Sequence, residues 1–97
     1  MSFSNYLETK VLDHVFGATA YTAPATLYVA LFTTAPGEAG GGTEISGSGY
    51  ARQSVAFTTT GDTTSNTAAV EFPTASGSWG TISYAAVYDA LTSGNQM

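Results

Sequence analysis

The chain has very little positive charge. Lys10 and Arg52 are its only Lys or Arg residues, and seven acidic residues give a net charge of −5 at pH 7. Proteins bind nucleic-acid phosphates with clusters of Lys and Arg. Two cations far apart in the sequence cannot form such a cluster, so the sequence excludes direct nucleic-acid binding.

Cysteine is absent, which excludes disulfides and thiolate metal sites. Long apolar runs are absent too, because none approaches the roughly 18 residues of a membrane-spanning helix. The first residues, Met1 to Tyr6, lack the basic flank and apolar centre of a secretory signal. We therefore expect no metal, no cofactor and no membrane partner, and synthesis in the cytoplasm of the producing cell.

Charge of either sign is scarce, since charged residues make up 9% of the chain, against about 25% in ordinary domains. The surface must then be covered mainly by Ser, Thr, Gly, Asn and Gln, and such a surface resists association less than a charged one. The 97 residues predict one small domain, residues 1–97. A chain of this size buries only about 60–70% of its unfolded surface, so we expect it to be stabilised by copies of itself or by a scaffold.

Four apolar runs of strand length, separated by clusters of Gly, Ser, Thr and Asn, predict a small antiparallel β domain. They span residues 26–33, 50–59, 67–72 and 81–90. The first has almost no polar face and is typical of a central strand, whereas the second alternates as a half-covered strand does. The predicted fold class is mainly β: a compact antiparallel β-sandwich or partial barrel with one N-terminal α-helix.

Two connecting segments differ in character. Residues 18–25 form a linker that ends near Pro24. Residues 34–49 form a long glycine-rich loop, in which Ile45 is the only apolar anchor. Long loops without structure of their own are usually functional or mobile, so we expect this loop to be mobile.

The single predicted helix covers residues 5–16. Ser4 or Asn5 can cap it, and Glu8 stands at capping-box spacing from Asn5. An apolar stripe recurs at helical spacing along one face: Leu7, Val11 and Val15, widened by Leu12 and Phe16. A helix of three turns is marginal in isolation, so this stripe is expected to dock on its own sheet or on a neighbouring subunit.

The last predicted strand is followed by a hairpin-turn signal at residues 92–95 and then by Met97. A turn without a returning strand is unusual. Either the sequence is a stretch of a longer protein, or the edge of the last strand is left for a partner to pair.

No constellation of residues indicates an enzyme. His14 lies beside Asp13, but neighbouring helix positions do not face each other, and a structural role is favoured. The acidic side chains show no motif spacing, and Asp62 to Asn66 lacks the glycine and distant Glu of a calcium loop. The glycines from Gly40 to Gly49 are followed by a strand and by no Lys, unlike a phosphate-binding loop.

Aromatic residues are abundant, and in strands they more often pack a sheet than contact a ligand. Trp79 stands just before a predicted strand, where it can cover the core or fill a subunit junction. Arg52 is the only cation in the predicted sheet, and we expect it to pair with Glu71 or Asp89. The candidate interface residues from the sequence are Leu7, Val11, Val15, Phe16, Arg52, Trp79 and Tyr88.

Several short motifs occur in a characteristic order along nearly the whole chain. They are Asn5-Tyr-Leu-Glu, Leu12-Asp-His-Val, Tyr28-Val-Ala-Leu-Phe-Thr-Thr, Gly49-Tyr-Ala-Arg-Gln, Phe72-Pro-Thr-Ala, Trp79-Gly-Thr-Ile and Ala86-Val-Tyr-Asp. In this order the chain resembles a family of small virion structural proteins of tailed bacteriophages, some of them tail-fibre-like.

The resemblance implies a non-enzymatic virion component made in the host bacterium. A tail location, as a fibre, fibre adaptor or tip component, is favoured, with capsid decoration (a cement protein) as the alternative. A carbohydrate-binding module that contacts a host-surface glycan is a third hypothesis. The implied partners are other phage virion proteins and further copies of the chain, most simply in a trimer.

Overall fold

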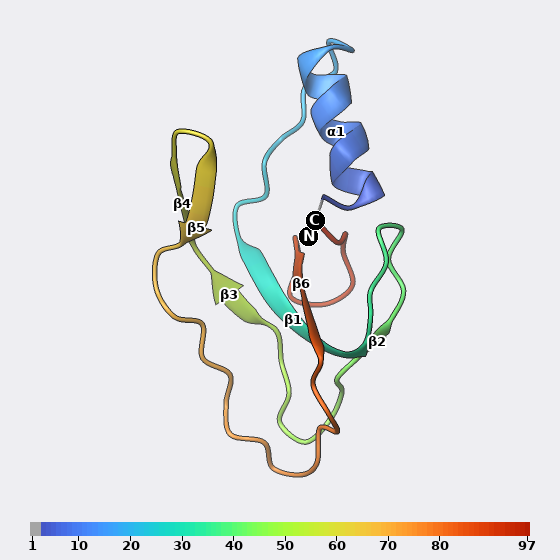
Figure 1. The fold of residues 1–97 in the computed structure, drawn as a ribbon, viewed down its shortest axis with the longest axis vertical. Helices are drawn as coiled ribbons and strands as arrows, with labels where there is room; N and C mark the ends of the chain where they lie inside the picture. Colours follow the sequence, from blue (N-terminus) through green and yellow to red (C-terminus); the bar gives the residue numbers. More distant parts are fainter. Residues whose placement is uncertain (1–2) are drawn as a thin grey trace.

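The computed structural model describes residues 3–97, which form one helix and six short strands (Figure 1). The elements are α1 (Asn5–Val15), β1 (Leu27–Thr34), β2 (Thr43–Glu44), β3 (Gln53–Val55), β4 (Phe57–Thr60), β5 (Thr63–Asn66) and β6 (Tyr84–Tyr88). The mainly β class with one N-terminal helix is therefore confirmed. Both sheets are antiparallel, and neither closes into a barrel.

Strand β1 lies at the centre of the main sheet, as its apolar sequence predicts. It pairs with β6 along one side, from Tyr28↔Tyr88 to Phe32↔Tyr84. On its other side the first half of β1 pairs with β3 and the last part pairs with β2. The small core lies on this sheet and consists of Ala30, Phe32, Ile45 and Ala86, with the ring of Tyr88 stacked on that of Phe32 at 6.2 Å.

Helix α1 begins where the capping signal predicts. Ser4 is the N-cap, and its hydroxyl oxygen accepts a hydrogen bond from the Leu7 N–H at 3.2 Å. The helix ends one residue before the predicted boundary, with Phe16 as C-cap. Figure 1 shows the helix projecting beyond one end of the main sheet, so that little of it lies over the strands.

The predicted second and third strands differ most from the structure. The run 50–59 is interrupted at Ala56 and gives β3 and β4. The prediction of a strand over 67–72 is wrong, and the partner of β4 is instead β5, where a turn was predicted. The physical reason is local: Gly61 adopts φ +62° and forms a tight turn with Asp62, while the β-branched threonines on either side favour strands.

The outer predicted strands are confirmed with shifted ends. Residues 26–33 correspond to β1, and residues 81–90 contain the shorter β6. Ile82 lies before the first residue of β6 and is 43% exposed.

The glycine-rich loop 34–49 contributes to the sheet. Thr43 and Glu44 form β2, and the Ile45 N–H donates to the Leu31 carbonyl at 3.0 Å. Ile45 is only 6% exposed. The expectation of a loop without structure is therefore wrong for residues 43–45, and mobility of the rest of the loop stays a prediction.

The chain does return after the turn at residues 92–95. The Asp89 N–H donates to the Asn95 carbonyl and the Met97 N–H donates to the Val87 carbonyl, so that residues 95–97 run alongside β6. The Ser4 N–H then donates to the Met97 carbonyl at 2.8 Å. This return corrects the expectation of an unpaired turn, and it joins the start of α1 to the main sheet.

Candidate interface

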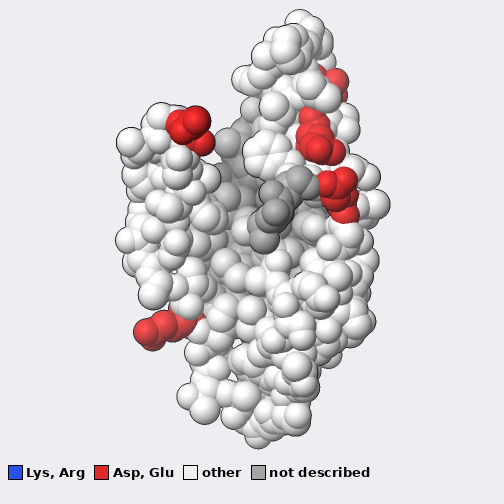
Figure 2. Space-filling model, in the orientation of Figure 1, with Lys and Arg blue, Asp and Glu red and all other residues white. Residues whose placement is uncertain are grey.

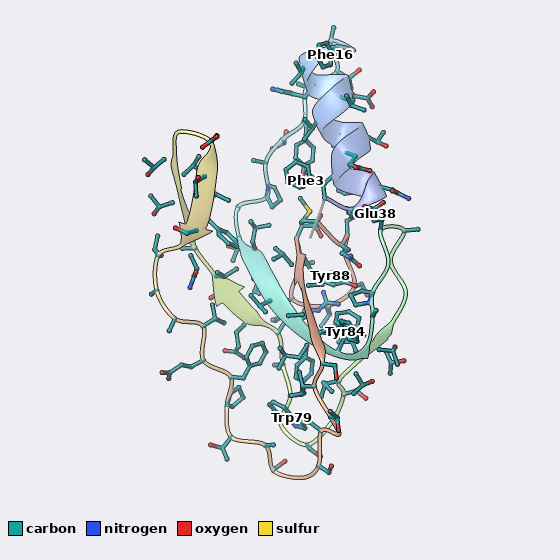
Figure 3. The ribbon with its side chains drawn as sticks, in the orientation of Figure 1. Phe3, Phe16, Glu38, Trp79, Tyr84 and Tyr88 are labelled. Atoms are coloured by element: carbon teal, nitrogen blue, oxygen red, sulfur yellow. The ribbon has the colours of Figure 1, made fainter. Side chains whose placement is uncertain are left out.

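The apolar stripe of α1 faces away from the rest of the chain. Leu12 is 57% exposed, Val15 61% and Phe16 80%, and no residue of the helix is buried. Val11 is also exposed, whereas Leu7 is half-buried. Figure 3 shows Phe16 at the far tip of the helix, away from the strands. The stripe therefore does not dock on its own sheet.

The opposite face of α1 makes the intrachain contacts. The ring of Tyr6 meets that of Tyr21 edge-on at 6.4 Å, and the Lys10 ammonium lies 5.6 Å from the centre of the Tyr6 ring. The Nδ1 atom of His14 accepts a hydrogen bond from the Tyr21 N–H at 3.1 Å. Burial is the main cause that raises the pKa of the Tyr21 hydroxyl. The linker 18–25 thus holds the helix by its polar and aromatic side, and the apolar side stays in solvent.

Charge is sparse over most of the surface, but the helix carries some of it. Figure 2 shows carboxylates along one side of the helix and at the opposite edge of the molecule, while most of this face is uncharged. Helix α1 itself contains Glu8, Lys10 and Asp13, so electrostatic repulsion between two copies is confined to the neighbourhood of these groups.

A second cluster of functional interest surrounds Arg52, whose side chain lies inside the fold. Its guanidinium forms a two-pronged ion pair with Glu44, through Nε to Oε2 at 2.9 Å and Nη2 to Oε1 at 2.8 Å. The Nη1 atom donates to the carbonyls of Ala90 and Ser93. The guanidinium also lies 3.9 Å from the centre of the Tyr88 ring. Arg52 therefore ties β2 and the turn after β6 to the start of β3.

This arrangement corrects the predicted partner of Arg52, because the ion pair is made with Glu44 and not with Glu71 or Asp89. Asp89 instead accepts hydrogen bonds from Asn95 in the turn. Sequence reasoning missed Glu44 because it lies in the segment that was predicted to be a mobile loop. Whether Arg52 and the half-buried Tyr88 contribute to an interface stays a prediction.

Hydrogen bonding and burial shift the pKa values in this cluster. The hydrogen bonds from Arg52 are the main cause that lowers the pKa of the Glu44 carboxyl. Burial, followed by the hydrogen bond to Glu44, raises the pKa of the Tyr50 hydroxyl to about 12. That hydroxyl donates to Glu44 Oε2 at 2.7 Å and accepts from the Leu31 N–H at 3.0 Å. The Arg52 pKa is raised mainly by its hydrogen bonds to Glu44, so the group stays fully ionised and serves a structural purpose.

Trp79 belongs to an aromatic cluster at the other end of the sheet, where Figure 3 labels it. Its ring meets the Tyr50 ring edge-on at 5.6 Å, and Phe72 stacks on the other side of Tyr50 at 6.0 Å. The indole N–H donates to the Ser48 carbonyl at 3.0 Å. This half-buried position fits the predicted role of covering the core, and a role at a subunit junction stays a prediction.

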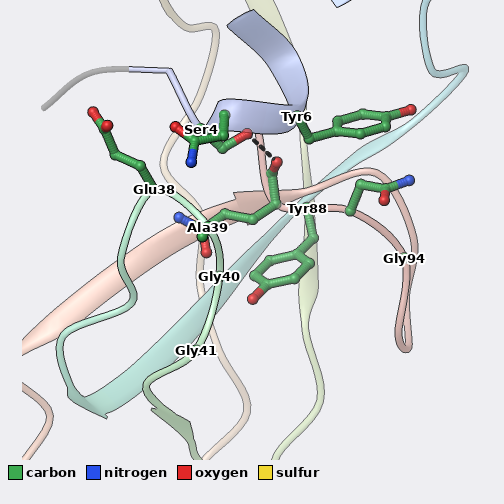
Figure 4. A pocket seen from close by; sticks show the side chains of 11 residues that line it. Ser4, Tyr6, Glu38, Ala39, Gly40, Gly41, Tyr88 and Gly94 are labelled. Carbon is green, nitrogen blue, oxygen red and sulfur yellow. Dashed lines mark hydrogen bonds between the residues drawn. The ribbon is translucent and has the colours of Figure 1, made fainter. Parts of the chain in front are cut away.

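A depression of the surface lies between the start of α1, residues 38–41 and residues 94–96 (Figure 4). It has a volume of about 480 Å³, it is open to solvent, and Tyr6, Glu38 and Tyr88 are among its lining residues. His14 is not among them.

Within residues 3–97 no group of His, Asp and Glu side chains is placed to hold a metal ion. The only helix there, α1, is too short to cross a bilayer.

The structure is that of a small, mainly β protein with low charge and an exposed apolar stripe on its single described helix. A model of one protein family matches residues 2–97, and its description is "Podophage GP4 fiber I protein gp80". The chain belongs to this family of podophage fibre proteins, which confirms the resemblance to tail-fibre-like phage proteins. The family is one of structural proteins, not of enzymes. No curated protein matches the chain.

Proposed function

We propose that this protein is a tail-associated fibre component of the virion that assembles with copies of itself through the apolar stripe of α1. The observation that carries the proposal is the orientation of this helix. Its polar and aromatic face is held by Tyr21, while Leu12, Val15 and Phe16 lie in solvent. A stripe of this kind on a short helix is stable only when a partner covers it.

The partner that fits the stripe is the same stripe of another copy. Leu7, Val11 and Val15 form a row at four-residue spacing, and such rows of two helices pack into each other's grooves. Glu8 is an exposed charged side chain on this face, one helical turn before Leu12. Identical helices therefore avoid like charges only when they meet through the later part of the stripe, along Val15 and Phe16. A closed threefold arrangement would cover every stripe in the assembly, and we therefore favour a trimer.

The free energies involved favour assembly through several weak contacts over assembly through one strong contact. Covering a large apolar side chain contributes roughly 1.5–3 kcal/mol, whereas association costs an estimated 4–15 kcal/mol in lost freedom of motion. The free energy gained by covering the few apolar side chains of one helix exceeds this cost only modestly. We expect reversible self-association in solution and firmer assembly in the virion, where further virion proteins hold several copies together.

The family favours a fibre over the alternatives of capsid decoration and carbohydrate binding, neither of which gains a supporting observation. Labelling of intact particles tests the location. Asp62 lies in the exposed turn between β4 and β5, and the chain has no native cysteine. Asp62→Cys therefore gives a single site for a maleimide-linked gold cluster. We expect gold at the tail in electron micrographs, and gold distributed over the capsid shell would overturn the tail assignment.

A further inference from the structure

The β4–β5 hairpin projects from the fold without a layer to cover it. Every residue of β4 and of β5 is exposed. Within the described range 3–97, neither the helix nor a strand of the main sheet makes extensive contact with the hairpin. Figure 1 shows the hairpin and α1 as two separate projections beyond the main sheet. Because an isolated two-stranded hairpin is at best marginally stable in water, a further contact is needed to hold this one in shape.

The register of the hairpin determines which of its backbone groups are paired. Thr58 lies opposite Ser65, and two residues further from the turn the Thr67 N–H donates to the Ala56 carbonyl at 2.9 Å. Hydrogen-bonded pairs alternate with non-hydrogen-bonded pairs along an antiparallel ladder. Thr58 and Ser65 therefore bond to each other through their backbones.

The same alternation turns the backbone groups of Thr64 and Asn66 outward, along the free edge of β5. The Thr59 hydroxyl donates to the Thr64 hydroxyl at 3.0 Å, which agrees with the close side-chain approach of a non-hydrogen-bonded pair. Among the residues that the structure describes, none bonds to the backbone of Thr64 or Asn66 from this side. Strand β4 likewise turns Phe57 and Thr59 outward along its own edge.

The two edges of the hairpin differ in access. Val55 lies opposite Leu27 of β1, and alternation turns Phe57 to that same side. The edge of β4 therefore faces the linker 18–25, and Phe57 and Pro24 line one open depression of about 470 Å³. Strand β5 lies on the other side of β4, so its free edge faces away from the main sheet.

The free edge of β5 has none of the usual protection. Natural proteins protect an edge strand with charged side chains, with proline or with a bulge. Strand β5, Thr63–Asn66, contains no charged residue and no proline, and its register with β4 is regular. Asp62 in the turn is the only charged residue of residues 57–66. An edge of this kind favours pairing with a further strand.

We propose that β5 of one copy pairs antiparallel with β5 of a second copy, about a twofold axis at Ser65. In this register Thr64 of each copy lies opposite Asn66 of the other, and each of these pairs exchanges two backbone hydrogen bonds. It is the register that pairs both outward residues of both strands. The result is a continuous four-stranded sheet in the order β4, β5, β5, β4.

Side chains and charges fit this register. Ser65 meets its counterpart at the axis as a non-hydrogen-bonded pair, in which side chains approach most closely and hydroxyls bond to each other. The register places Asp62 of one copy beside Ala68 of the other. The two Asp62 carboxylates are then about 20 Å apart along the strands, a distance over which salt screens their repulsion.

This contact shares with the proposed function only the premise that copies of the chain associate, because it uses a surface other than the apolar stripe of α1. A twofold contact is closed in itself. Together with a threefold contact through the stripe, it would link one trimer to another.

Amide hydrogen exchange on the unmodified protein tests the pairing. We expect the amides of Thr64 and Asn66 to exchange quickly in dilute protein and at least about tenfold more slowly in concentrated protein. The Ser65 amide, which bonds within the hairpin, should change little, and the Phe57 amide on the edge of β4 should stay fast. Fast exchange of Thr64 and Asn66 at every concentration would overturn the proposal.

A disulfide test checks the register. The chain has no native cysteine, and Ser65→Cys places two thiols opposite each other at the axis, within disulfide reach. The matched control is Thr58→Cys, which is exposed on the same face of the hairpin but lies on β4. In a glutathione redox buffer we expect covalent dimers of Ser65→Cys and at least about tenfold less of the control.

The other outcomes separate this contact from its alternatives. Dimers of Thr58→Cys alone would show pairing through β4, and a disulfide that forms only when the two variants are mixed would show pairing of β4 with β5; either result overturns the proposal, as does equal oxidation of both variants. The Ser65→Cys dimer should also form in the Val11→Asp background, so that failure of the stripe contact leaves this result intact. Loss of the dimer in that background would overturn the edge as an independent contact.

Discussion

A charge placed in the apolar stripe separates the role of α1 within one chain from its role between chains. Val11→Asp is the informative change, because Val and Asp have similar helix propensities. The sequence alone leaves open whether the stripe docks on its own sheet. Under that hypothesis the substitution would cost at least about 2–3 kcal/mol of folding stability.

The structure lowers the expected cost to the single chain. No residue of α1 is buried, and Val11 is 37% exposed with its neighbours Leu12 and Val15 still more exposed. Substitutions at such positions usually change stability by about 0.5 kcal/mol. Allowing for the part of Val11 that is covered, we expect the free energy of unfolding to fall by less than about 1 kcal/mol.

The cost should appear in assembly instead. Placing a charge in an apolar contact costs about 2–3 kcal/mol, which corresponds to roughly 30- to 150-fold weaker association for each contact. Urea unfolding and sedimentation velocity measure the two quantities on the same samples. The matched control is Thr22→Asp, which adds the same charge at an exposed position of the linker 18–25 and not on the helix; it should leave stability and association unchanged. A Val11→Asp variant that unfolds more easily by 2–3 kcal/mol, or that associates like the wild type, would refute this reasoning.

Four further predictions concern the Arg52 cluster and the loop 34–49. Glu44→Gln should cost about 2–3 kcal/mol in urea unfolding, because it leaves the buried Arg52 guanidinium without its counter-charge. Since the pKa of Glu44 is lowered in the fold, its stabilisation is present above the unfolded pKa and is lost as pH falls through the folded pKa. The variant should therefore lose less stability than the wild type on acidification, and an identical acid profile would contradict the ion-pair account. In ultraviolet titration one tyrosine should ionise near pH 12 and be missing in Tyr50→Phe; because that pKa is raised, its contribution to stability is complete below the unfolded value and is lost as pH rises towards 12. Deleting Gly40 to Gly42 should change stability by less than about 1 kcal/mol, because closure entropy varies slowly with loop length. Ile45→Ala should cost about 2–4 kcal/mol, since Ile45 is buried, and the opposite order of the two costs would show that the glycines are the structural part of this loop.

The parts of the fold that sequence could predict are those with strong local signals. Ser4 and the apolar spacing of α1 mark the helix, and the apolar run of β1 marks a central strand. The turn at Gly61 is also visible in the sequence, but Thr63 and Thr64 fall within the predicted turn region although their β-branched side chains favour strands. The strand over 67–72 was predicted from alternation alone, and alternation does not say whether a partner strand is in place.

The Arg52 cluster shows a different limit. The sequence indicates that a lone cation in a sheet pairs with a carboxylate, and it favours Glu71 or Asp89 as that partner. Glu44 is the partner because β2 pairs with the last part of β1, a long-range contact that leaves no local mark in the sequence. The direction of the apolar stripe was likewise unpredictable, because it is set by Tyr21, whose contacts with Tyr6 and His14 hold the opposite face of the helix.

Hydroxyl-radical footprinting of the wild-type protein tests the central claim most directly, because it requires no substitution in the stripe. The assay compares oxidation of Phe16 and Leu12 in dilute protein, in concentrated protein and in intact particles, with Phe57 on the β4–β5 hairpin as internal reference. Phe16 and Leu12 are 80% and 57% exposed in the single chain, and Phe57 is 39% exposed. The account predicts that oxidation of Phe16 and Leu12 falls several-fold relative to Phe57 as the protein associates, and that it stays low in the virion. Protection in the virion without protection in the concentrated protein would assign the stripe to another virion protein, and unchanged oxidation under all three conditions would contradict the docking role of α1.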